Sequence, residues 1–244
     1  MRLLDRQISL LEFLTSSAAI FGAGEDVIVD ESLQGIDQGL LRLEARFSFE
    51  KRMEKIGSVF PLTLQLLGIE QEPIVRLFIA ACPPFDISRI ENARQFYQFL
   101  YTHWEHTPTK PPYLPDVATC ELAYEQFRIT TSGPELAGAS SEIVLRRPSV
   151  RRMPGIILFR SAYDIQPLFE TRSLELVPAE CNTGLVIAVP PDADRPKVFE
   201  LHPLAFEFLA GLDDWTARSA LDLTPDLDEL ISELAAHGLV EVYR

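Results

Sequence analysis

The side chains best suited to chemistry lie near the middle of the chain. His103 and His106 are three residues apart, so on a helix both imidazoles could contact one metal ion, but no third ligand follows at a recognisable spacing. Asp116 and Glu121 are five residues apart, which places their carboxylates on different faces of a helix and disfavours a paired acid–base role. We therefore expect helix caps and ion pairs here rather than a metal or catalytic site.

Other signatures of catalysis are weak or missing. Gly22-Ala23-Gly24 follows an expected helix rather than a strand, and two acids come next, so this segment is typical of a turn and not of a phosphate-binding loop. The sequence contains no nucleophile-elbow serine, no zinc-protease motif and no P-loop lysine. Cys120 has the spacing of a buried helix face, where no neighbour activates a thiol. The sequence thus predicts a chain that is not an enzyme and has no catalytic, cofactor or metal site of its own.

The charge balance narrows the classes of partner. The chain of 244 residues has a formal net charge of −14, which repels the phosphates of nucleic acids and anionic lipids. No apolar run approaches the roughly 20 residues that span a bilayer. Three widely spaced cysteines do not form a disulfide framework, so we expect a cytoplasmic protein without nucleic-acid or membrane partners. One basic cluster is either a contact patch or a solvated strand face: Arg146, Arg147, Arg151 and Arg152.

Hydrophobic periodicity indicates a helical front half. Ser88 and Glu91 have the form of a capping box, which starts a strongly patterned helix. Small residues, glycine and proline gather at 131–140 and are typical of a linker. We therefore expect an all-helical bundle over 1–130. Its predicted helices are 2–20, 35–57, a short helix ending at Gly68, 73–81, Ser88 through Trp104, and Val117 through Phe127.

The pattern after the linker is mixed. The predicted strands are Glu142–Leu145, Gly155–Phe159, Leu174–Val177, Gly184–Val189 and Lys197–Leu201, with a hairpin turn at 190–194 between the last two. Helices at 203–211, 215–221 and 225–237 follow, and a short strand, Leu239–Tyr243, ends the chain. A β-hairpin with three helices is typical of a winged-helix module. The prediction is an α+β protein whose second domain covers 141–244.

A winged-helix module suggests either DNA or peptide binding. The helix at 225–237 would read DNA, but it carries four acids and no Lys or Arg, so phosphate repels it. The strand Lys197–Leu201 could instead be an open edge to which an extended peptide adds. The apolar groove between that strand and the last helix would be lined by Val198, Leu201, Leu227, Leu230, Ile231 and Leu234. The alternative is that these side chains are core.

The chain resembles a known family in both halves. Residues 198–209 and 227–240 resemble the peptide-recognition elements of ribosomal-peptide (RiPP) biosynthesis, and their layout is similar to the PqqD-like fold. In the front half, four segments resemble partner proteins of the multinuclear non-haem iron oxidases, such as those of 3-thiaglutamate and methanobactin biosynthesis. They are Val59-Phe60-Pro61, Cys82-Pro83-Pro84, 96–100 and, most specifically, 112–123.

The resemblance implies a heterodimer with a separate TIM-barrel oxidase, which would hold the irons and oxidise a cysteine of the precursor peptide. This chain would bind the peptide leader through Val198, Phe199, Glu200, Leu201, Leu227, Leu230, Ile231 and Leu234. Tyr113, Asp116 and Glu121 would meet the oxidase. Overall likeness favours the 3-thiaglutamate type, in which the peptide's C-terminal cysteine loses its β-carbon. The alternatives are a methanobactin-type partner for oxazolone and thioamide formation, or a winged-helix DNA-binding regulator.

Overall fold

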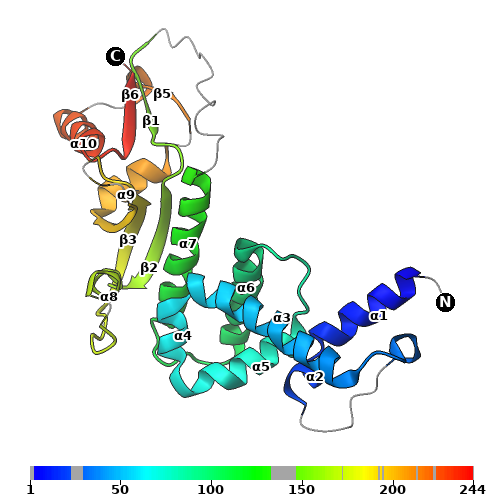
Figure 1. Cartoon of the computed structure of the whole chain (residues 1–244). Helices are drawn as coiled ribbons and strands as arrows, with labels where there is room; N and C mark the ends of the chain where they lie inside the picture. The colour runs from blue at the N-terminus through cyan, green and yellow to red at the C-terminus, as the bar shows by residue number, and fades with distance from the viewer. Residues whose placement is uncertain are drawn as a thin grey trace. The chain divides into compact units, whose positions relative to one another are not determined.

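The computed structural model describes residues 3–22, 30–132, 147–171, 173–191, 193, 195–212, 214–221 and 224–243. The chain forms two compact units, Met1–Ala118 and Thr119–Arg244, whose boundary falls inside helix α7 (Figure 1). Helices together with two small antiparallel sheets confirm the α+β class. Most of the predicted linker at 131–140 lies outside the described residues.

The described part of the first unit is helical. Its α-helices are α1 Leu3–Thr15, α2 Ser17–Phe21, α3 Gln38–Val59, α4 Pro61–Leu67, α5 Gln71–Ala81, α6 Arg89–His106 and the first part of α7, Leu114–Ser132. Two 3-10 turns, Glu31–Leu33 and Gly68–Glu70, complete it. The single helix predicted at 2–20 is broken at Ser16, because the Ser16 hydroxyl accepts the Ala19 N–H and starts a new helix there.

The predicted capping box at Ser88 forms only in part. The Ser88 hydroxyl accepts the Glu91 N–H at 3.3 Å, which confirms Ser88 as the N-cap of α6. The Ser88 N–H donates to Asp86, while the Glu91 carboxylate pairs with Arg94. Asp86 thus takes the reciprocal role that the spacing assigned to Glu91.

A buried arginine ties three segments of this unit together. Arg52 of α3 donates to Asn92 Oδ1 at 2.9 Å, to the Cys82 carbonyl at 2.9 Å and to Gln95 Oε1 at 2.6 Å. Its guanidinium also lies 4.4 Å from the centre of the Phe78 ring. Burial lowers the pKa of Arg52 to about 10, because desolvation penalises the charged form. The spacing of apolar residues in the sequence, which predicts the helices, does not predict this hydrogen-bond network.

The second unit contains every described strand. The first sheet has the order β2-β3-β4, and the second has the order β5-β1-β6. The strands are β1 Ser149–Arg152, β2 Ile157–Tyr163, β3 Glu180–Ala188, β4 Lys197–Leu201, β5 Thr216–Ala217 and β6 Val240–Tyr243. The helices are α8 Gln166–Thr171, α9 Pro203–Ala210, α10 Pro225–Ala236 and a 3-10 turn at Arg218–Ala220.

The structure confirms some of these predicted elements and corrects others. Strand Lys197–Leu201 and its antiparallel pairing with the preceding strand are confirmed. No strand forms at Leu174–Val177, where Val177 is 82% exposed and no neighbouring strand pairs with the segment. The helix predicted at 215–221 is wrong, because Thr216 and Ala217 pair with β1 instead. The strand predicted at Glu142–Leu145 lies outside the described residues.

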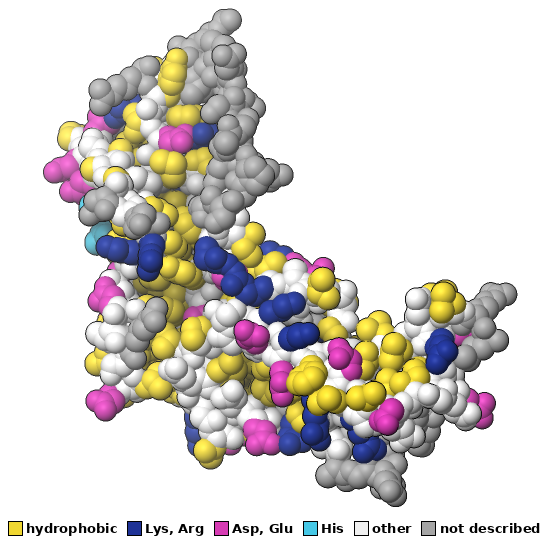
Figure 2. All heavy atoms as spheres, in the orientation of Figure 1, with side chains coloured by type: hydrophobic (Ala, Val, Ile, Leu, Met, Phe, Trp, Pro, Cys, Tyr) yellow, Lys and Arg dark blue, Asp and Glu magenta, His cyan; other side chains and the backbone are white. Residues whose placement is uncertain are grey.

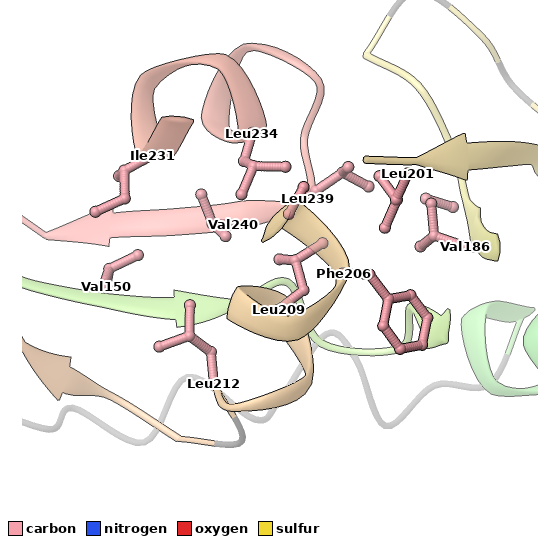
Figure 3. Packing of buried hydrophobic residues seen from close by; sticks show 12 residues of the cluster. Val150, Val186, Leu201, Phe206, Leu209, Leu212, Ile231, Leu234, Leu239 and Val240 are labelled. Atoms are coloured by element: carbon pink, nitrogen blue, oxygen red, sulfur yellow. The ribbon is translucent and has the colours of Figure 1, made fainter. Parts of the chain in front are cut away.

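One hydrophobic core joins both sheets to α9 and α10 (Figure 3). Val186 and Leu201 reach it from the first sheet, and Val150 and Val240 reach it from the second. Gly184 of β3 is required for this packing, because a Cβ at this position would lie 2.5 Å from Phe206 Cδ2. The opposite face of the first sheet packs on the second part of α7 through Ile187.

Candidate functional site

Strand β4 lies at the edge of its sheet. On one side it pairs with β3, in the register Val186↔Phe199 and Ile187↔Val198. On its other side, no strand pairs with it among the described residues. Such an edge presents unpaired backbone groups to which an extended chain can add.

The outward backbone groups of β4 can be assigned from one hydrogen bond. The Glu200 N–H donates to Gln166 Oε1 at 3.2 Å, so it points away from β3. Backbone groups alternate in direction along an antiparallel strand. The N–H and C=O of Val198, two residues before Glu200, therefore also point away from β3. An incoming peptide would find its partners at Val198 and Glu200.

The edge is less open than the sequence suggests. Helix α8 lies against β4, and the side-chain oxygen of its first residue, Gln166, accepts the hydrogen bond from the Glu200 N–H. Gln166 is itself held by Glu170, whose Oε1 accepts a hydrogen bond from Gln166 Nε2 at 2.7 Å. A bound peptide strand must replace the Gln166 oxygen with one of its own carbonyl oxygens.

The predicted groove residues do not share one surface. Phe199 and Leu201 face the core shared with α10, whereas Val198 packs on the opposite face of the sheet with the cluster that includes Phe127. Alternation along the strand makes this separation unavoidable. Of the groove set proposed from sequence, Val198 therefore contributes backbone groups but not a side chain beside α10.

Most of the α10 stripe is core. Ile231 and Leu234 are 2% and 4% exposed and pack under α10, so no peptide can reach them without unfolding the module (Figure 3). Leu227 and Leu230 are half-buried at the margin of the same core, as is Phe199 of β4. Of these three half-buried side chains, Phe199 belongs to the edge strand itself, whereas Leu227 and Leu230 belong to the helix that packs with β6.

The charges of the edge strand are mixed, and acids gather on α10 in the same unit. Lys197 and Glu200 of β4 are both exposed. The four acids of α10, a helix that packs with β6, are exposed too: Asp226, Asp228, Glu229 and Glu233. Arg218 neutralises only part of this charge through its ion pair with Asp228. A ligand with basic side chains suits this surface better than an acidic one.

The residues assigned to a partner interface have little exposed surface. Tyr113 and Glu121 are both 5% exposed, and Asp116 is half-buried and already interacts within the chain. Burial raises the pKa of the Tyr113 hydroxyl and of the Cys120 thiol. The expected contact with the oxidase through Tyr113, Asp116 and Glu121 stays a prediction, and their burial gives it no support.

The histidine pair and two arginines of the basic cluster have local partners, while Arg146 lies outside the described residues. The His103 ring stacks on Phe99, and His106 Nδ1 lies 2.9 Å from the Thr102 carbonyl. Over the described residues, no three His, Cys, Asp or Glu side chains are grouped to hold a metal ion. Arg151 pairs with Glu241 and lies 4.6 Å from the centre of the Trp215 ring, and Arg152 contacts the Leu209 carbonyl. Arg151 and Arg152 thus support the module.

Comparison with known proteins adds no identity. No protein-family model matches the chain, and no curated protein matches it. Within the part of the chain that the structure describes, no helix is long and apolar enough to cross a membrane.

Proposed function

We propose that this chain is the non-catalytic partner subunit of a multinuclear non-haem iron oxidase in RiPP biosynthesis. In this role it binds the leader of a ribosomally made precursor peptide in the cytoplasm and presents the peptide's cysteine to the oxidase. The oxidase is a separate TIM-barrel chain that holds the irons. The preferred reaction is excision of the β-carbon from a C-terminal cysteine, as in 3-thiaglutamate biosynthesis, and the alternative is the methanobactin type.

The observation that supports this proposal best is the edge of β4, with which no other described strand pairs on its outer side. The outward backbone groups of Val198 and Glu200 can pair with an extended leader once the Gln166 side chain is displaced. The exposed acids of α10, in the same unit, favour a basic leader. Affinity would come from the main chain, and preference among leaders from charge and from the half-buried Phe199, Leu227 and Leu230.

A proline at the edge tests the proposal directly. Val198→Pro removes the outward N–H of Val198 and leaves the ladder to β3 intact, because the β3 bonds come from the alternate residues. We expect its affinity for the leader peptide to fall about tenfold, as the loss of one main-chain hydrogen bond predicts. Fluorescence anisotropy with a labelled leader measures this affinity.

Val198→Ala is the matched control, since it removes the same side chain but keeps the N–H. Equal affinity of the proline and alanine variants would place the leader elsewhere. Co-expression with the neighbouring oxidase tests the assembly. Equimolar co-elution, with iron following the oxidase, supports a subunit role, whereas stoichiometric iron in this chain alone would refute it.

A further inference from the structure

Loop 82–88, which joins α5 to α6, is held by hydrogen bonds but exposes two large apolar side chains. Four of its carbonyl groups accept hydrogen bonds from side chains of α3 and α6. The donors are Arg52, Lys55, Asn92 and Gln95. Phe85 and Ile87, however, are 72% and 86% exposed. Because the loop is already ordered, it can bind another molecule at a low cost in conformational entropy.

A groove lies beside this loop on the surface of α6, and we call it the Phe85 groove. It has a volume of about 510 Å3, and its lining includes Cys82, Phe85, Arg94, Gln98 and Phe99. A cavity of about 150 Å3 can hold a benzene ring, so the groove has room for an aromatic side chain from another molecule.

The loop and the groove together form a surface that can pair with itself. A two-fold interface uses the same patch on both copies, so this patch must supply both a protruding group and the site that receives it. Phe85 protrudes, and the groove next to it is large enough to receive the Phe85 of a second copy. The exposed Asp86 would then approach the second copy's Arg94, which lines the groove. Arg94 pairs with Glu91 in its own helix, but its guanidinium has further N–H donors for a second carboxylate.

The charges around the groove do not oppose such a pairing. Over loop 82–88, α6 and the Lys55 that bonds to the loop, the exposed and half-buried bases and acids are equal in number. The bases are Lys55, Arg89 and Arg94, and the acids are Asp86, Glu91 and Glu105. Figure 2 likewise shows Lys and Arg side chains among Asp and Glu side chains over α3, the helix that carries Lys55. The net charge of −14 acts over longer distances, and physiological salt screens it beyond about 8 Å.

We propose that this chain forms a two-fold symmetric dimer in which Phe85 of each copy enters the Phe85 groove of the other. Asp86 and Arg94 then pair twice across the interface, which fixes how the two copies are aligned. The contact surface is small, so we expect a reversible dimer with a Kd on the order of 10 µM. The dimer does not depend on the proposed function, since neither a leader nor an oxidase takes part in it.

Sedimentation velocity of the full chain at about 1–200 µM, a range that brackets this Kd, tests the proposal. Phe85→Asp removes the entering side chain and Gln98→Trp fills the groove, so each should weaken the dimer at least about 30-fold. Ile69→Asp is the matched control, because Ile69 is 91% exposed in the same unit and does not line the groove. Circular dichroism checks the fold of each variant.

A charge exchange tests the two-fold arrangement itself. Asp86→Arg and Arg94→Glu each place like charges opposite one another in the dimer, so each variant alone should be monomeric. An equimolar mixture of the two variants restores both ion pairs and should dimerise again. Mixing would not repair a folding defect in either variant, so recovery reports on the contact between the copies.

The outcomes separate the interpretations. A wild-type dimer that Phe85→Asp and Gln98→Trp disperse, and that Ile69→Asp retains, supports the proposal. A wild-type chain that stays monomeric over the whole concentration range overturns it and leaves the groove to a different ligand. A dimer that Phe85→Asp leaves intact, or charge variants that remain monomeric when mixed, also overturns it, because the two copies then do not meet in the proposed way.

Discussion

Replacing Gln166 with alanine should make the edge of β4 a better peptide site. The Gln166 side chain accepts the Glu200 N–H, which is the bond that a peptide carbonyl must form on binding. The hydrogen bond between Gln166 and Glu200 must therefore break before a leader can bind to the Glu200 N–H. Gln166→Ala removes this competitor and leaves the N–H free for the peptide.

The expected size of the effect follows from that one hydrogen bond. It joins neutral groups at an exposed site at 3.2 Å, so its net contribution is about 0.5–1.5 kcal/mol. Removing it should lower the Kd of the leader about 2-fold to 10-fold. The free energy of unfolding should fall by at most about 1–3 kcal/mol, because the exposed Gln166–Glu170 hydrogen bond is lost together with the bond to Glu200.

Fluorescence anisotropy with the labelled leader measures the gain, and a urea titration measures the cost in stability. Thr171→Ala is the control in the same helix. The Thr171 hydroxyl donates to the Pro167 carbonyl and accepts the Ser173 N–H, and neither bond involves β4, so this change should not alter the affinity. An unchanged or weaker affinity of Gln166→Ala would refute strand addition at Glu200, even if the peptide binds elsewhere on the module.

Two further predictions concern the scaffolds of the two units. Arg52→Met should lower the free energy of unfolding by about 3 kcal/mol, because Asn92 and Gln95 lose buried charged partners, and a loss below about 1 kcal/mol in urea would contradict the network. Gly184→Ala should cost about 1–3 kcal/mol, since its Cβ would overlap Phe206 Cγ and Cδ2, and in a Phe206→Ala background, where these atoms are missing, the same change should cost less in thermal unfolding. Additive losses in that double variant would exclude the proposed overlap.

The sequence was sufficient to predict those elements whose ends are marked by residues next to them in the chain. Strand β4 is predicted to the residue because Pro196 and His202-Pro203 delimit a short β-rich segment. Helix α10 is equally well marked by Thr224, whose hydroxyl accepts the Leu227 N–H, and by Gly238 with a φ of +70°.

Elements that depend on distant partners could not be predicted in this way. Segment Trp215–Leu221 has helical spacing, but Thr216 pairs with Val150, more than sixty residues earlier, and only the fold brings them together. Leu174–Val177 has strand-like composition and finds no partner among the described strands. Arg52 looks like a surface arginine in sequence, because its three acceptors come from α6 and from the carbonyl that follows α5.

The candidate site shows this limit of prediction from sequence even more clearly. A stripe such as Leu227, Leu230, Ile231 and Leu234 is identical in sequence whether it lines a groove or fills a core, and here its buried members hold β6 against α10. A module this small cannot leave both faces of α10 for a ligand, because it would lose part of the core that joins its two sheets. Selectivity for a leader must therefore come from the half-buried side chains at the margin of the core and from the exposed acids of α10. We accordingly expect substitutions at Leu227 or Glu229 to alter leader preference while the fold is retained.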